Sequence, residues 1–270
     1  MIKILYVRAF KRLPRDYEFI KALDKHEDIS LVICTQYSLR NYYNTTKALK
    51  EKLCADVVIN FTRDLSISRR AEAENILLLN KADPASIAND KWKTYKKLET
   101  IGIPQPKTSL TQDFKAPYIY KDRMGSFGNN IKLITEDTLL QPTNPGYIFQ
   151  EYIAESAGKS IRVVMIDKKP VAWLLKVNKK SFLSHYRHGG ESYSFEMTPE
   201  VEEICCKAAE CLDLNYCAID LLLSNRGPLL LEVNSGAGIT GIKDFTGVDV
   251  PKLVIDFIIE KYNNKEKKEA

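Results

Sequence analysis

Short apolar runs alternate with amphipathic segments along the first third of the chain. Four apolar runs predict buried strands: Ile2–Val7, Ser30–Cys34, Val57–Phe61 and Ile76–Leu79. Between them, the spacing of apolar residues in Tyr17–Leu23 and Thr46–Leu53 predicts two helices. Strands that alternate with helices are typical of a parallel sheet with helices on its faces. No glycine-rich phosphate loop follows these strands, so we expect this part of the chain to frame a cleft rather than to bind a dinucleotide.

From about Lys81 the pattern changes to longer strands. A helix predicted over Asp90–Thr100 ends at Gly102-Ile103-Pro104, because glycine and proline stop a helix. Five strand-like segments follow: Tyr118–Lys121, Ile131–Ile134, Tyr147–Gln150, Ile161–Ile166 and Val171–Lys176. Apolar periodicity predicts two further helices, over Glu200–Leu212 and Val250–Tyr262. The whole pattern indicates a mixed α/β (α+β) fold.

Composition narrows the class of protein. The 270 residues suggest about two domains. The 40 basic and 35 acidic residues give a net charge of +5 that is spread along the chain, which does not support a nucleic-acid-binding protein. The six cysteines form no C-x-x-C pair, and no signal peptide is visible, so we expect reduced thiols in a cytoplasmic protein. No segment approaches the ~20 apolar residues of a membrane helix.

The most informative segment is Ala218–Asn234, where two apolar runs flank a turn-forming stretch. This pattern predicts an antiparallel hairpin. If its turn is centred at Arg226, Asp220 lies directly opposite Glu232. Side chains alternate between the two faces of a strand, so Glu232 and Asn234 share a face. The three oxygen-bearing side chains are therefore expected to converge.

Two carboxylates between apolar runs need compensation. Burial of a charge is costly, and like charges opposite each other in a hairpin repel. A divalent cation removes both problems, and hard oxygen ligands suit Mg²⁺, which commonly binds few carboxylates together with nucleotide phosphates. The alternative is that these side chains lie at strand ends, in water or in salt bridges. We favour the metal site, because three such residues share one face.

A glycine-containing loop follows the strand that ends at Lys121. The loop holds Gly125, Ser126 and Gly128, and it leads into another strand rather than into a helix, which excludes a P-loop. Glycines allow backbone N–H groups to approach phosphate oxygens, and a neighbouring lysine can reach the same oxygens. A glycine-rich hairpin turn without ligand explains the loop equally well.

Taken in order, several segments make the chain resemble the ATP-grasp superfamily, and within it the RimK-type carboxylate–amine ligases. The similarity runs from about Asn80 to Lys261. The segments are Asn89-Asp90-Lys91, Gly102-Ile103-Pro104, the strand ending at Lys121 with its glycine loop, Phe149–Ile153, Ile161–Val164, Gly189-Gly190, Ala218–Asp220 and Leu231–Ser235.

The resemblance implies a domain organisation. An N-terminal parallel-sheet domain, the pre-ATP-grasp domain, would span residues 1–80, and an ATP-grasp domain would span residues 81–270. Within the latter, ATP would be held between two α+β subdomains: a glycine-loop subdomain over about residues 81–150 and a metal-binding subdomain over about residues 151–270.

The resemblance also implies roles for single residues. ATP phosphates would be bound by Lys91, Lys121, Lys176 and the loop of Gly125, Ser126 and Gly128. The hinge that hydrogen-bonds adenine would be Glu151, Tyr152 and Ile153, next to Gln150. Arg162 would hold the reacting phosphoryl group or carboxylate, and with Lys176 it would be catalytic. Asp220, Glu232 and Asn234 would bind Mg²⁺, with Mn²⁺ as an alternative metal.

Two positions depart from the family pattern. Ser160 stands where the family usually has an aspartate that is often taken to bind ribose, and a hydroxyl can still form a hydrogen bond there. His185 stands where the family often has asparagine before its Gly-Gly turn. His185 contacts substrate or phosphate in one interpretation and is an exposed loop residue in the other.

The implied reaction joins a carboxylate to an amine. The carboxylate would attack the γ-phosphate of ATP to give an acyl phosphate and ADP, and the amine, an amino acid, would then attack the acyl group. The carboxylate would belong to a peptide, a protein or a small molecule, and relatives often form homo-oligomers. The alternatives are an ATP-dependent kinase of the same fold and a non-catalytic nucleotide-binding protein.

Overall fold

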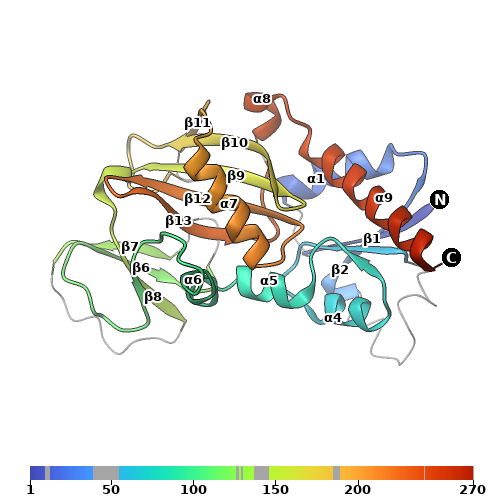
Figure 1. Cartoon of the computed structure of the whole chain (residues 1–270), viewed down its shortest axis with the longest axis horizontal. Coiled ribbons are helices and arrows are strands. Elements are labelled where there is room, and N and C mark those ends of the chain that lie inside the picture. Colours follow the sequence, from blue (N-terminus) through green and yellow to red (C-terminus); the bar gives the residue numbers. More distant parts are fainter. Residues whose placement is uncertain are drawn as a thin grey trace.

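Three sheets organise the part of the chain that the structure describes (Figure 1). The structure is a computed structural model, and it describes residues 1–9, 13–38, 55–125, 128, 130–136, 146–184, 189–239 and 241–269. The predicted helix over Thr46–Leu53 lies outside these residues. The mixed α/β class predicted from the sequence is confirmed.

The first sheet, called the N-terminal sheet, is parallel and has the strand order β2-β1-β3-β4. Its strands are β1 (Ile2–Arg8), β2 (Ile29–Thr35), β3 (Val57–Asn60) and β4 (Leu77–Leu78). Helix α1 (Pro14–Asp24) connects the first two strands, and α4 (Ser66–Ala73) precedes the last. The four apolar runs read from the sequence are these four strands.

Side-chain alternation along β1 assigns the helices to the two faces of the N-terminal sheet. Ile4 and Tyr6 pack in one core with α1 and the C-terminal helix α9 (Val250–Glu269), whereas Leu5 and Val7 pack in another with α4. Figure 1 shows α1 and α9 together on one side of the sheet and α4 on the other. Both faces are therefore covered, as a parallel sheet requires.

The second sheet, called the central sheet, is antiparallel and has the order β11-β10-β9-β12-β13. Its strands are β9 (Lys159–Ile166), β10 (Lys169–Val177), β11 (Glu191–Tyr193), β12 (Tyr216–Ser224) and β13 (Gly227–Asn234). Helix α7 (Pro199–Cys211) buries Val201, Cys205 and Ala208 against one face of this sheet. The short helix α8 (Ile242–Thr246) follows β13.

The third sheet, called the small sheet, is antiparallel with the order β5-β8-β6-β7. Its strands are β5 (Thr108–Ser109), β6 (Tyr118–Asp122), β7 (Ile131–Ile134) and β8 (Tyr147–Glu151). Helices α5 (Ala82–Ala88) and α6 (Lys91–Glu99) lead into it from the N-terminal sheet, and the one-turn helix η1 (Ala154–Ser156) leads out to the central sheet.

Short elements are the ones that sequence patterns did not predict. Helices α4, α5 and α8 and strands β5 and β11 have two to eight residues each, too few for a clear periodicity. Helix α9 continues to Glu269, beyond the predicted end at Tyr262, because its lysines and glutamates favour helix without burying an apolar face. No helix in the described ranges is both long and apolar enough to cross a membrane.

One hydrophobic core joins the N-terminal sheet to the central sheet. The Tyr216 ring of β12 lies 5.9 Å from the Phe19 ring of α1 and 5.6 Å from the Phe61 ring that follows β3. Tyr216 and Phe19 are fully buried. The two sheets are thus packed against each other, and the division of the chain at residue 80 stays a prediction.

Asn80 ties this junction together by hydrogen bonds to backbone groups. Its Oδ1 accepts from the N–H groups of Asn215 and Tyr216, both at 3.0 Å. Its Nδ2 donates to the carbonyls of Tyr216 at 2.7 Å and Ser235 at 2.9 Å. One side chain therefore links the segment after β4 to the start of β12 and to the residue that follows β13.

Asn80→Ala is expected to destabilise the protein. The substitution removes partners from four backbone groups, and unpaired backbone groups in a partly buried site cost about 2–4 kcal/mol in total. Urea unfolding should detect this loss. Asn263→Ala, at an exposed position of α9, is the matched control and should change stability by less than about 0.5 kcal/mol. An equally stable Asn80→Ala variant would contradict this role for Asn80.

Candidate functional site

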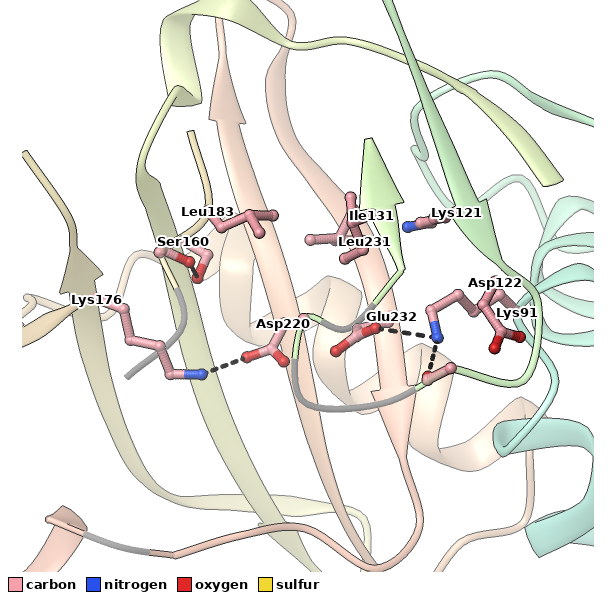
Figure 2. Close-up of a pocket in the computed structure, with 13 residues that line it drawn as sticks. Lys91, Lys121, Asp122, Ile131, Ser160, Lys176, Leu183, Asp220, Leu231 and Glu232 are labelled. Atoms are coloured by element: carbon pink, nitrogen blue, oxygen red, sulfur yellow. Dashed lines mark hydrogen bonds and ion pairs between the residues drawn. The ribbon is translucent and has the colours of Figure 1, made fainter. Parts of the chain in front are cut away.

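A cavity lined by several charged side chains lies between the small sheet and the central sheet (Figure 2). Its lining residues are Lys91, Lys121, Asp122, Gly125, Gly128, Ile131, Ser160, Lys176, Leu183, Ser184, Asp220, Leu231 and Glu232. A second cavity shares Lys91, Gly125, Leu231 and Glu232 with the first and continues toward α6, where Asn234 and Gln150 line it. Most residues predicted to bind ATP or metal thus meet in one region.

The β12–β13 hairpin sets Asp220 directly opposite Glu232, as predicted. The predicted position of the turn, centred at Arg226, was wrong. The turn is the two-residue stretch Asn225-Arg226, so Leu221 pairs with Leu230, and a bulge at Leu231 adds one residue before Glu232 pairs with Asp220. A bulge shifts the register by one position and re-aims the side chains beyond it.

Asp220 is buried and is neutralised by two cations from neighbouring strands. Arg162 of β9 donates to both of its carboxylate oxygens, from Nε at 2.9 Å and from Nη2 at 2.6 Å. Lys176 of β10 donates to Oδ1 at 3.2 Å. Burial alone would raise the pKa of Asp220, but the charges of Arg162 and Lys176 outweigh burial and hold the pKa well below its usual range. Asp220 is therefore ionised at neutral pH.

Glu232 has a different cationic partner. The Nζ of Lys91 lies 3.7 Å from Glu232 Oε2 and also donates to the carbonyl of Gly125 in the glycine loop. Figure 2 shows Lys176, Asp220, Glu232 and Lys91 as a row in which two adjacent carboxylates lie between two lysines. Asn234 donates from Nδ2 to Glu232 Oε1 at 3.2 Å.

Helix capping holds Lys91 in place. Asp90 is the N-cap of α6, and its carboxylate accepts from the N–H groups of Trp92 and Lys93. Arg123, which follows β6, forms a two-point ion pair with this carboxylate at 2.6 and 2.7 Å. The backbone N–H of Lys91 also donates to the Arg123 carbonyl at 3.1 Å. Lys91 and the start of the glycine loop are thus fixed relative to each other.

Lys121 is buried in β6, and its Nζ donates to Oε1 of Gln150 in β8 at 2.8 Å. Burial lowers the pKa of Lys121 to about 7, and the nearby charge of Lys91 acts in the same direction. Burial likewise lowers the pKa of Lys176 to about 8, and the charge of Arg162 acts in the same direction. Both lysines lack enough negative charge around them, which is the condition of groups prepared for an anionic ligand.

Ser160 contributes a hydroxyl to the cavity, next to a residue that the sequence did not single out. Its Oγ lies 2.6 Å from the Oγ of Ser184, and both side chains line the cavity together with Leu183. Leu183 and Ser184 belong to an irregular segment, and no sequence pattern marked them. The N–H of Gly158 donates to the Phe182 carbonyl, and this hydrogen bond holds the segment with Leu183 and Ser184 beside β9.

The predicted hinge lies apart from the cavity walls. Glu151 forms an ion pair with Arg226 at 2.7 Å and accepts from the backbone N–H of Lys107. Neither Glu151 nor Tyr152 nor Ile153 is among the described residues that line the two cavities, so the adenine contact stays a prediction. Ser126 and His185 lie outside the described residues.

The donor set of the hairpin fits Mg²⁺. Asp220 and Glu232 offer carboxylate oxygens side by side, and the hydrogen bond from Asn234 Nδ2 leaves its amide oxygen as a third donor. Such hard oxygen ligands, few in number and beside phosphate-binding cations, suit Mg²⁺. Within the described ranges, no three His, Cys, Asp or Glu side chains gather into a metal-binding group. The proposed set is therefore two carboxylates and one amide.

Comparison with known proteins gives a consistent result. A family model described as the RimK-like ATP-grasp domain matches residues 88–258. A protein of Pseudoalteromonas translucida named "Probable alpha-L-glutamate ligase" is 30% identical over 219 residues, which cover 74% of this chain and 73% of that protein.

Two solved structures show the fold. The D-alanine–D-alanine ligase from Bacillus anthracis complexed with ATP aligns with a TM-score of 0.71 at 17% identity and covers 100% of both chains. The ATP-grasp ligase PsnB, complexed with a phosphomimetic variant of its minimal precursor, Mg and ADP, aligns with a TM-score of 0.71 at 17% identity, covering 96% of this chain and 98% of that one.

Arg162→Met is expected to lower the free energy of unfolding by about 3–5 kcal/mol, because it leaves the buried Asp220 with one partner. Adding Asp220→Asn should restore much of this loss, because the uncompensated charge is then gone. Arg69→Met, which removes an exposed arginine paired with exposed Asp83, is the matched control and should have little effect. Urea unfolding of the wild type, the two single variants Arg162→Met and Asp220→Asn, and the double variant measures the coupling, and strictly additive effects of the two site substitutions would contradict it.

Proposed function

The chain belongs to the RimK-like ATP-grasp family, and from this membership we propose that it is an ATP- and Mg²⁺-dependent ligase that joins a carboxylate to an amine. The observation that carries the proposal is the row of Lys176, Asp220, Glu232 and Lys91 in the cavity between the two antiparallel sheets. Two adjacent carboxylates beside several cations suit a metal-bound polyphosphate better than any uncharged ligand.

The charges of the site support binding of a nucleotide triphosphate. Four cations, Lys91, Lys121, Arg162 and Lys176, face three carboxylates at the cavity, Asp122, Asp220 and Glu232, which leaves an excess of one positive charge when all are ionised. We propose that Lys91 and Lys121 bind the phosphates, together with the backbone of Gly125 and Gly128. ATP would then lie between the small sheet and the central sheet.

The metal would be held by Asp220, Glu232 and Asn234. Mg²⁺ bound there would neutralise charge on the phosphate oxygens during transfer. Arg162 and Lys176 come from the neighbouring strands β9 and β10 and approach the same carboxylate, Asp220. We propose that these two cations also orient the substrate carboxylate and the γ-phosphoryl group, since phosphoryl transfer depends mainly on positioning and charge.

The proposed reaction has two steps. A carboxylate oxygen of the substrate attacks the γ-phosphorus of ATP, and the bond to the β-phosphate oxygen breaks, giving an acyl phosphate and ADP. The amine nitrogen of an amino acid then attacks the acyl carbon, and inorganic phosphate leaves as the amide forms. Partial burial of the cavity limits hydrolysis of the acyl phosphate by water.

Two comparisons support the kinds of substrate that we propose. The P. translucida relative is named for glutamate, and PsnB is complexed with a precursor in its solved structure. We propose an amino acid such as glutamate as the amine and a peptide, protein or small-molecule carboxylate as the acceptor. A reaction of this kind, which consumes ATP, fits the cytoplasm.

The proposed function is tested by incubating the protein with Mg-ATP and pooled amino acids, with and without a peptide and metabolite extract of its host. Release of ADP that requires an amine, with a product lighter than its two substrates by one water, is the expected result. A phosphorylated product without amine dependence would instead identify a kinase. ATP binding without turnover in any pool would favour the non-catalytic nucleotide-binding protein.

Glu232→Ala is expected to abolish turnover, because it removes one carboxylate of the metal site and the partner of Lys91. Glu203→Ala, which removes an exposed glutamate of α7 that pairs with Lys207, is the matched control and should retain wild-type turnover. ADP release and product mass are measured for both variants. Near-normal turnover of Glu232→Ala would remove the metal assignment.

ATP binding is expected to take up about one to two protons at pH 8, most of one at Lys121 and about half of one at Lys176, whose pKa is about 8. Lys121, with a pKa of about 7, is mostly neutral at that pH in the free protein, and phosphate beside it would raise its pKa. Affinity should therefore fall as the pH rises above about 7, by up to tenfold per pH unit for each lysine that takes up a proton. Calorimetry in two buffers of different ionisation enthalpy measures the uptake. Lys121→Met should reduce it, and zero uptake by the wild type would contradict the argument.

A further inference from the structure

The loop that follows β13 is held by its carbonyl groups. Each carbonyl from Ser235 to Gly238 accepts a hydrogen bond from a side chain outside the loop, and we call this segment the clamped loop. The four donors, in order along the loop, are Asn80 Nδ2 at 2.9 Å, Arg15 Nη1, Tyr216 Oη at 3.3 Å and Arg162 Nη1 at 3.4 Å.

This clamping determines where the loop presents its N–H groups. In a trans peptide the N–H points away from the preceding carbonyl, so the N–H groups of Gly236 to Ile239 face away from the four donors. Asn234 immediately precedes the clamped loop, and Arg162 reaches both its last carbonyl and Asp220. The first residue of the clamped loop therefore follows the proposed metal ligand Asn234. Its last residue, Gly238, is linked through Arg162 to the proposed metal ligand Asp220.

Two of the four donors come from the N-terminal part of the chain: Asn80, which follows β4, and Arg15 of α1. Arg15 lies in the first turn of α1, is only 6% exposed, and its guanidinium lies 4.4 Å from the centre of the Phe61 ring. Its nearest carboxylate, Asp16, is 3.5 Å away and already accepts from the hydroxyl of Tyr6 at 2.9 Å. The Nε of Arg15 is buried without a hydrogen-bond partner among the residues that the structure describes.

Stability does not explain a guanidinium in this position. The Nη2 of Arg15 has two long contacts, to Asp16 Oδ1 and to the Phe61 carbonyl, both at 3.5 Å. With these weak partners and an Nε unpaired among the described residues, burial of the charge costs more in desolvation than the contacts recover. An unbranched apolar side chain of similar length would pack against Phe61 and Tyr216 at lower cost. A buried polar group that lowers stability calls for another explanation, and the contact of Arg15 that reaches the segment beside the proposed metal site is the bond to Gly236.

We propose that Arg15 is a positioning residue of the ligase site. By holding the Gly236 carbonyl, it fixes the clamped loop between Asn234 and Arg162, so that the N-terminal sheet determines the geometry of the reaction centre. Arg15 is too deeply buried to touch a substrate itself. This inference rests on the proposed function.

Arg15→Met separates positioning from a structural role. We expect kcat to fall about 10- to 100-fold, as a misplaced group near the reaction does, with KM for ATP changed less than about twofold. The urea midpoint should equal or exceed that of the wild type. Arg15→Lys should recover part of kcat, because lysine can still donate to Gly236. Arg69→Met, an exposed arginine on α4, is the control and should match the wild type in all three measurements.

Gly236→Ala probes the same contact from the loop side. A Cβ at this position would lie 3.3 Å from Arg15 Nη1 and 3.6 Å from Phe61 Cδ1, so the guanidinium must move by a few tenths of an ångström. We expect a smaller fall in kcat than for Arg15→Met, and little further fall when both substitutions are combined. Independent, multiplying effects of the two substitutions would overturn the proposal.

Hydrogen exchange of the amides of residues 236–239 gives a readout that needs no substrate. Arg15→Met should increase their exchange rates about tenfold while exchange in the strands of the central sheet stays unchanged. Unchanged loop exchange, or a fall in kcat that only parallels a loss of urea stability, would overturn the proposal. If the wild type shows no turnover with any substrate pool, the proposed function fails, and the exchange experiment still decides whether Arg15 holds the loop.

Discussion

The structure depends on how two carboxylates are kept side by side inside a sheet. Asp220 and Glu232 are opposite each other in the β12–β13 hairpin, where they repel. Arg162, Lys176 and Lys91 supply the compensating charge, and each comes from a different element. The repulsion is therefore compensated only when β9, β10 and α6 pack around the hairpin, because each of them carries one of the compensating cations.

Burial is the main cause of the lowered pKa values in the cavity, and the charges of neighbouring cations act in the same direction. Lys121 and Lys176 have lowered pKa values because they are buried near other cations. An anionic ligand would restore the ordinary protonation of both, so part of the binding free energy comes from relief of repulsion that exists in the free protein. A metal ion would act in the opposite sense and compensate the carboxylates. A metal polyphosphate supplies both charges at once, which is why we favour it as the ligand.

The pairing of Asp220 with Glu232 could be predicted from the sequence because two apolar runs around a turn nearly determine a hairpin. The turn was placed half a residue too far along the chain, but the bulge at Leu231 adds one residue and restores the predicted pair. The sequence could not predict Leu183 and Ser184, which reach the cavity through a backbone contact of Gly158 with an irregular segment. It also missed α4, α5 and α8, which are too short for periodicity. Arg15 carried no signal either, because one arginine at the start of an amphipathic helix is ordinarily a solvated residue.

The N-terminal sheet was expected only to frame a cleft, and its contacts give it a larger part. Asn80, which follows β4, binds backbone groups at the start of β12 and just after β13, and Phe19 and Phe61 share a core with Tyr216 of β12. Tyr216 in turn donates to the loop that follows β13. Because these hydrogen bonds and ring contacts hold the start of β12 and the loop after β13, we expect a displacement of the N-terminal sheet to shift the hairpin that carries Asp220 and Asn234. The geometry of the proposed metal site is thus a property of both sheets, although all of its ligands come from one hairpin.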